Sequence, residues 1–109
     1  MDGLAFMEDV TFPDYSIVAP GSTLDKQWLV QNSGSCNWDN RYRLRLISGA
    51  ALGASIEQAI FPARAGMQAN LQIIFTAPTE AGEYTSEWQA FDENGIPFGE
   101  SFFIKIIVQ

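Results

Sequence analysis

Carboxylates are the side chains in this sequence whose number and placement most readily suggest chemistry. The chain has 13 Asp and Glu against 6 Lys and Arg, for a net charge of −7 over 109 residues. Asp92, Glu93 and Asn94 stand together before a glycine and are candidate calcium ligands, but we favour a solvated turn of the same composition. Asp9 and Asp14 are weaker candidates of the same kind. A carboxylate pair could also cleave a glycosidic bond, although sequence spacing alone does not identify one.

Other catalytic classes lack their residues. The chain has no histidine, which excludes Ser-His-Asp and Cys-His catalysis and histidine-based zinc sites. Cys36 has no cysteine partner for a disulfide or metal cluster, and we expect it to be a small buried residue. No GxGxxG, GxxxxGK[ST] or GxSxG string occurs. We therefore predict a non-enzymatic domain without metal or cofactor.

The charge balance also limits the partners. An acidic surface repels phosphate groups, so we expect neither nucleic acid nor an anionic membrane as a partner. No apolar run approaches the ~20 residues that cross a bilayer, so no membrane insertion is expected. The first ten residues lack the basic and apolar regions of a signal peptide. Neither the compartment nor the oligomeric state follows from the sequence.

The elements that must position these residues are strands. Apolar and polar residues alternate over 24–30, 41–47, 69–75, 83–90 and 102–108, which is typical of half-buried antiparallel strands. Asn94-Gly95 has the residue types of a type I′ hairpin turn. Residues 49–60 contain a helical spacing, but their glycines disfavour a helix, and we predict a loop followed by a strand at 55–61.

This pattern predicts one all-β domain. An Ig-like antiparallel β-sandwich of about 7–9 short strands is expected over residues 9–109, with residues 1–8 as a tail. Arg41, Arg43 and Arg45 are expected to share a solvent face with Glu83 and Glu87 on a neighbouring strand.

The strings PGSTLDKQWLVQNSGSCNW, FTAPTEAGEYTSEWQAF and GIPFGESFFIKIIV carry a family resemblance. They resemble the FW (four-tryptophan) domain, the Ig-like central domain of the "next to breast cancer gene one" selective-autophagy receptor, a module that also occurs in uncharacterised prokaryotic proteins. The matching positions are Lys26, Trp28, Asn32, Gly34, Cys36, Trp38, Pro78, Gly82, Tyr84, Trp88, Phe98 and Gly99. Phe103 stands near the place of the fourth tryptophan, so the resemblance implies a prokaryotic relative that keeps three of the four.

The resemblance implies a non-catalytic module that binds a protein partner and belongs to a larger protein. Trp28 and Trp88 are expected in the core, whereas Trp38, Phe103 and the turn Asp92, Glu93 and Asn94 are candidate partner contacts. Phe103 falls on the outward phase of its strand, where an apolar side chain suggests a contact surface. The alternative is a carbohydrate-binding module of a surface or secreted protein, in which tryptophans form an exposed platform.

Overall fold

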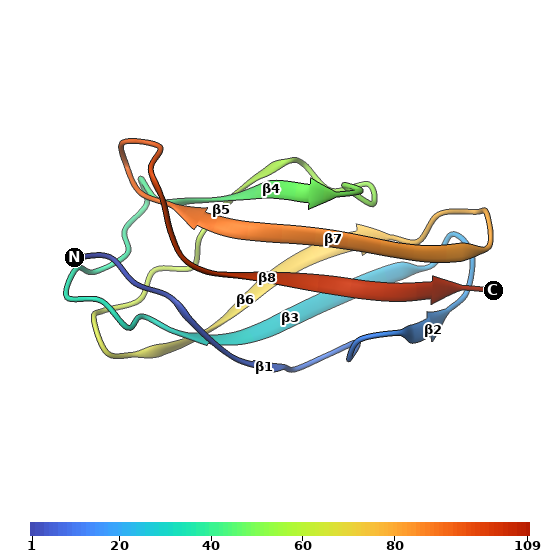
Figure 1. Ribbon diagram of the computed structural model, residues 1–109, viewed down its shortest axis with the longest axis horizontal. Coiled ribbons are helices and arrows are strands. Elements are labelled where there is room, and N and C mark those ends of the chain that lie inside the picture. The colour runs from blue at the N-terminus through green and yellow to red at the C-terminus, as the bar shows by residue number, and fades with distance from the viewer.

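The computed structural model describes all 109 residues and consists of two packed β-sheets (Figure 1). The small sheet has the order β1-β3-β6 and contains β1 (Ala5–Asp9), β3 (Thr23–Gln31) and β6 (Gln68–Thr76). The large sheet has the order β2-β8-β7-β4-β5 and contains β2 (Ser16–Val18), β4 (Arg43–Gly49), β5 (Glu57–Ala59), β7 (Gly82–Phe91) and β8 (Pro97–Val108). Paired strands are antiparallel except β2, which runs parallel to β8. The predicted Ig-like antiparallel sandwich is confirmed, and no helix is present that could cross a membrane.

The core lies between the sheets and is built from the inward phase of each long strand. Trp28 of β3 packs on Phe102 of β8 with ring centroids 4.8 Å apart, and Phe75 of β6 packs on Trp88 of β7 at 6.1 Å. Strand β3 therefore lies over β8, and β6 lies over β7. Each large apolar side chain buried here stabilises the fold by about 1.5–3 kcal/mol. The predicted inward phases of β3, β6, β7 and β8 are confirmed.

Residues 1–8 are not the tail that we predicted. Leu4 is buried and residues 5–9 form β1, which pairs with β3. The β1–β3 register shifts between Phe6 and Glu8, and most β1 side chains are exposed. A bulged strand of this kind shows no alternation in its sequence, and so the pattern did not reveal it.

The predicted antiparallel pairing of β4 with β7 is confirmed, and Arg45 lies opposite Gln89, on the same face as Glu87. The predicted neutralisation by Glu83 and Glu87 is wrong, since neither carboxylate forms an ion pair. The register shifts at Ile47, and neither Arg43 nor Arg45 lies opposite Glu87. Both arginines instead reach Glu57 of β5, with N–O distances of 3.7 and 2.9 Å. The short strand β5, which we predicted over the longer range 55–61, therefore supplies the counter-charge.

The hairpin between β7 and β8 is present, but its turn is not type I′. That turn requires positive φ at both central residues, whereas only Gly95 has one, at 76°. The Gly95 N–H donates to the Asp92 carbonyl, and Asp92 Oδ1 accepts the N–H groups of Asn94 and Ile96 at 2.8 and 2.9 Å. The Asp92 carboxylate is thus used to hold its own turn.

The helical spacing in residues 49–60 reflects two loop residues that cover the core. Leu52 and Ile60 are buried although both lie outside the strands, and β5 is confined to Glu57–Ala59. The Leu52 carbonyl accepts the N–H of Thr76 at 2.8 Å, which ties the loop after β4 to the end of β6.

Candidate functional site

Most residues that carry the family resemblance are structural, and Lys26 is the most unusual of them. It lies on the inward phase of β3 and is fully buried. Its Nζ donates to Asp9 Oδ1 at 2.8 Å and to the carbonyls of Thr11 and Phe12 at 2.6 and 3.0 Å. A buried ammonium is tolerated only when paired and fully hydrogen-bonded, and here all of its donors have acceptors. Lys26 therefore fixes the chain between β1 and β2.

Trp28 and Trp88 are packing centres, as predicted. Both side chains are fully buried. The Trp28 Nε1–H donates to the Phe103 carbonyl at 2.9 Å, which links β3 to β8, and the Trp88 Nε1–H donates to Ser86 Oγ at 2.8 Å. Neither indole is available as a platform for a sugar.

Asn32 organises the loops at one end of the sandwich. Its Nδ2 donates to the carbonyls of Cys36 and Ala63 at 2.9 and 3.0 Å, and its Oδ1 accepts the Gly34 N–H at 3.2 Å. Cys36 is half-buried rather than buried as we predicted, because it lies in the loop that Asn32 shapes.

Trp38 is not a contact residue. Its side chain is 2% exposed and packs on Phe98, with ring centroids 6.3 Å apart. Tyr42 packs edge-on against the same Phe98 ring at 5.7 Å, and its hydroxyl donates to Asp2 Oδ1. Burial, together with that hydrogen bond, raises the pKa of Tyr42 well above its usual value. The polar neighbours of Trp38 in the sequence suggested an exposed side chain. In the structure its backbone lies in a loop, but its side chain points into the core.

The remaining motif residues shape turns and strand ends. The Pro78 carbonyl accepts the Gly21 N–H, Gly82 begins β7, and the Tyr84 hydroxyl donates to the Glu80 carbonyl at 3.0 Å.

Gly99 and Gly34 are required for the close approach of the N-terminal segment. Gly99 has φ of 75°, and a Cβ there would collide with Leu4. A Cβ on Gly34 would collide with the backbone of residues 1–3. Both motif glycines thus seat the segment that we took for a tail.

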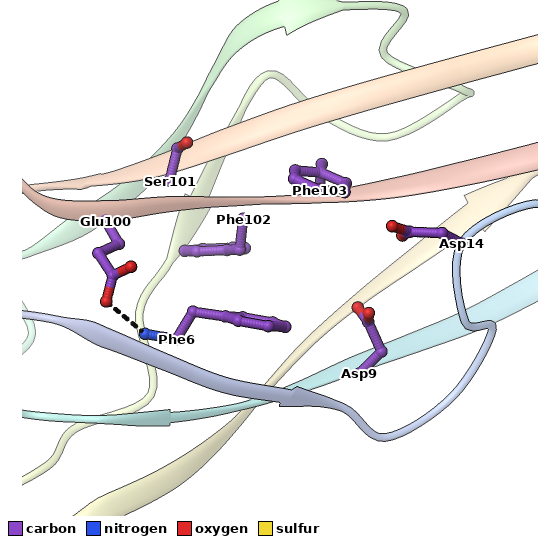
Figure 2. Close-up of a pocket in the computed structure, with 7 residues that line it drawn as sticks. All are labelled: Phe6, Asp9, Asp14, Glu100, Ser101, Phe102 and Phe103. Atoms are coloured by element: carbon purple, nitrogen blue, oxygen red, sulfur yellow. Dashed lines mark hydrogen bonds between the residues drawn. The ribbon is translucent and has the colours of Figure 1, made fainter.

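The candidate functional site is a groove between β1 and β8, which we call the β1–β8 groove (Figure 2). It has a volume of about 250 Å³, and its lining residues are Phe6, Asp9, Asp14, Glu100, Ser101, Phe102 and Phe103. Figure 2 shows Phe102 pointing from β8 toward Phe6, while Phe103 lies on the other side of the β8 ribbon. Of the predicted contacts, only Phe103 lies here; the hairpin and Trp38 do not line the groove.

The groove combines aromatic walls with an acidic rim. Asp9 is held by Lys26, and Glu100 Oε1 accepts the Phe6 N–H at 3.2 Å. Asp14 and Glu100 are exposed and form no ion pair, and Lys105 Nζ lies 4.6 Å from the ring centroid of the neighbouring Phe103. This arrangement can bind a cationic, partly apolar group. No group of three or more His, Cys, Asp or Glu side chains could hold a metal ion.

Sequence analysis missed Phe6 and Glu100 as groove residues. Asp9 and Asp14 were noted only as weak cation ligands. The sequence places the aromatic residue Phe6 three residues before Asp9, and the structure shows that Phe6 is exposed. Because we interpreted residues 1–8 as a tail, we did not assign Phe6 to a site.

The sequence can now be compared with those of known proteins. A family profile described as the Ig-like domain from next to BRCA1 gene matches residues 11–108. The chain belongs to this family. The mouse "Next to BRCA1 gene 1 protein" is 32% identical over 103 residues, covering 92% of this chain and 10% of that protein. Potato "Protein JOKA2" is 32% identical over 107 residues, covering 94% of this chain and 12% of its own length.

More distant similarity extends to other proteins with the fold. Zebrafish "Protein ILRUN" is 22% identical over 106 residues, covering 97% of this chain and 38% of that protein. The solved structure of WR4, a C. elegans MSP family member, has a TM-score of 0.51 at 11% identity and covers 89% of this chain and 94% of that one. The WR4 likeness shows the fold alone. The chain spans about a tenth of the length of the mouse and potato relatives, so it corresponds to a single Ig-like domain within them.

Proposed function

We propose that this next-to-BRCA1-gene Ig-like domain is a non-catalytic protein–protein interaction module and one domain of a larger protein. Its partner is unidentified, and we infer that an extended segment of that partner, positively charged, binds in the β1–β8 groove. The family membership supports an interaction role, and the groove supports the location. The prokaryotic origin and the replacement of a fourth tryptophan at Phe103 stay predictions of the resemblance.

The observation that carries the proposal is the pair of rim carboxylates without an ion pair, Asp14 and Glu100, beside the exposed ring of Phe6. Phe6 is 36% exposed in a groove that reaches the core residue Phe102. Apolar contact with Phe6 would supply affinity. Attraction to the carboxylates would select a cationic partner and make binding sensitive to salt.

The test is a titration of the ¹⁵N-labelled domain with a capped peptide that alternates leucine and lysine. We expect the backbone amide chemical shifts of Phe6, Ser101 and Phe103 to change on binding. The affinity for the peptide should fall as the salt concentration rises. The double variant Asp14→Lys/Glu100→Lys should reduce affinity by about tenfold or more, equivalent to about 1.4 kcal/mol.

Glu80→Lys/Glu83→Lys is the control for charge alone, because both residues are outside the groove and in no ion pair, and the net charge changes by the same amount as in the groove variant. Equal losses in both variants would reject the groove as the site. Glu93→Lys tests the hairpin, and a selective loss there would move the site to residues 92–94.

The carbohydrate-binding alternative requires exposed tryptophans. Trp28, Trp38 and Trp88 are at most 2% exposed, so none offers a flat face to a sugar ring. We expect acrylamide to quench their fluorescence weakly and oligosaccharides to leave the spectrum unchanged. Strong quenching that a glycan reverses would favour the alternative.

A further inference from the structure

The edges of the two sheets differ in how they are protected against pairing with another chain. β2 and β5 have three residues each, and β1 has an irregular register and carries Glu8 and Asp9. β6 has nine residues in regular register with β3, and no charged residue occurs between Arg64 and Glu80. Proteins normally block long edges with charges, proline, bulges or a covering segment. Within β6 the sequence supplies none of the first three.

The backbone of β6 is unpaired along most of its outer edge. The Thr76 N–H points away from β3 to the Leu52 carbonyl, whereas the next N–H, of Ala77, donates to Ser22 beside β3. Backbone groups alternate in direction along a strand, so Gln68, Asn70, Gln72 and Ile74 also point outward. No hydrogen bond outside the β-ladders involves the N–H or C=O of these four residues.

The small sheet also ends before the large one. Since β6 lies over β7, the strands β4 and β5 extend beyond it and face no strand of the small sheet. Two large apolar side chains are exposed at β6 itself: Met67, which precedes the strand, and Ile74 within it, at 58% and 50%. The place beside β6 is therefore bordered by apolar side chains and by a row of unpaired backbone groups.

We propose that the outer edge of β6 binds an extended, β-branched segment of a partner protein, free of acidic side chains, as a fourth strand of the small sheet. Backbone hydrogen bonds to Asn70, Gln72 and Ile74 would hold the segment, and every second side chain of the segment would lie on the same face of the small sheet as Ile74. The composition of the segment follows from the site. Asp25 of β3 lies opposite Ile74 and accepts a hydrogen bond from Gln72 at 2.8 Å, so it would repel an acidic side chain. β-branched residues are the ones that favour an extended strand. This edge is separate from the β1–β8 groove, so each site can fail without the other.

The segment is not a second copy of β6 paired over its full length. In an antiparallel pair centred on Gln72, Thr76 of one copy would lie opposite Gln68 of the other. The position beside Thr76 is already filled by Leu52, whose carbonyl bonds to it. Leu52 of each copy would thus overlap the backbone of the other near Gln68, whereas a single extended segment avoids this overlap.

Hydrogen exchange of the free domain tests the open edge first. We expect the amides of Asn70, Gln72 and Ile74 to exchange rapidly and those of Leu71 and Ile73, which face β3, to be protected. Protection of all five would show that the edge is covered and would overturn the proposal.

The binding test uses a capped peptide that alternates threonine with valine and isoleucine. We expect it to slow exchange at Asn70, Gln72 and Ile74 by about tenfold or more at saturation. Gln72→Pro removes an outward N–H without touching the β3 ladder and should abolish this protection, while Gln72→Ala should retain it.

If Gln72→Pro does not fold, Ile74→Asp is used and should weaken peptide binding, because it removes an exposed apolar side chain and places a second carboxylate opposite Asp25. The proposal is overturned if the peptide causes no protection, protects the groove residues instead, or binds Gln72→Pro as well as Gln72→Ala. Dimerisation of the free domain that Gln72→Pro abolishes would assign the edge to a second copy and would also overturn it. Asp14→Lys/Glu100→Lys should leave this binding unchanged, which separates it from the proposed groove function.

Discussion

On the side where β1 meets β8, hydrogen bonds join the two sheets along the groove, whereas on the side of β6 the corresponding backbone groups are unpaired. On the first side, which we call the closed side, Glu100 N–H donates to the Leu4 carbonyl at 2.9 Å and Trp28 donates to the Phe103 carbonyl. On the second, the open side, the Thr76–Leu52 bond lies at the end of β6. Figure 1 shows β1 and β2 along one long side and β4 along the other.

The difference shows how one small sandwich can hold one side together by specific hydrogen bonds and leave a strand edge unpaired on the other. The closed side depends on particular partners, above all the acceptors of Lys26, so its residues have few tolerated replacements. The open side consists of uncharged residues whose outer groups contact water, and single changes there remove little. We therefore expect mutational sensitivity to be concentrated on the closed side.

The largest effect is expected for Lys26→Met. Removing the ammonium leaves Asp9 and the Thr11 and Phe12 carbonyls without their donor, and breaking a buried pair in this way costs about 3–5 kcal/mol. Partial exposure of Asp9, at 23%, places the value toward the lower end. Chemical denaturation measures it, with Lys105→Met on the outer face as the control, expected within about 1 kcal/mol of wild type. Similar losses in the two variants would contradict the special role of Lys26.

A smaller effect is expected for Gly99→Ala. The φ of 75° strains any other residue by about 1 kcal/mol, and the new Cβ would also displace Leu4, so we expect a total cost of about 2–3 kcal/mol. Gly21→Ala is a matched control, because Gly21 has φ of 72° with open space around its Cβ position. Equal unfolding free energies for the two variants would show that Leu4 is not held by this contact.

The sandwich itself could be predicted from the sequence because its long strands alternate cleanly. Residues 69–75 and 102–108 place apolar side chains on one face with period two, and that pattern alone gives the strand and its buried side. The groove could not be predicted in the same way. It depends on β1, whose irregular pairing removes the alternation, and on contacts between residues far apart in sequence, such as Phe6 with Glu100.

Lys26 shows the same limit at a single position. It interrupts the apolar phase of β3 with a charged side chain. Its acceptors come from a loop whose path is set by tertiary packing, so the buried amine could not be distinguished from an exposed one beforehand. The family motif named Lys26 without giving its role.

Tyr42→Phe should produce a moderate effect that depends on pH. Near neutral pH the variant loses the hydrogen bond to Asp2, which contributes about 0.5–1.5 kcal/mol. Because the folded-state pKa of Tyr42 is raised, its contribution is fully present below the unfolded pKa of about 10 and is lost as pH rises toward the folded pKa. Wild-type stability should thus fall more steeply above pH ~10 than that of Tyr42→Phe. Parallel curves from thermal unfolding at several pH values would contradict this assignment.

The smallest effect is expected for Gln72→Lys at the centre of the open side. The Gln72 side chain is exposed, and its Nε2 donates to Asp25 Oδ1 at 2.8 Å, so a lysine would keep an attraction to the same carboxylate. The outward backbone of Gln72 has no partner to lose, and lysine is a common residue on exposed sheet edges. We expect the unfolding free energy to change by less than about 0.5 kcal/mol. Ile73→Lys is the matched contrast, because this neighbour is 2% exposed and an unpaired buried charge there should prevent folding. A loss above about 1 kcal/mol for Gln72→Lys, read from denaturant unfolding, would mean that this edge is packed against the rest of the chain and that the two sides do not differ as described.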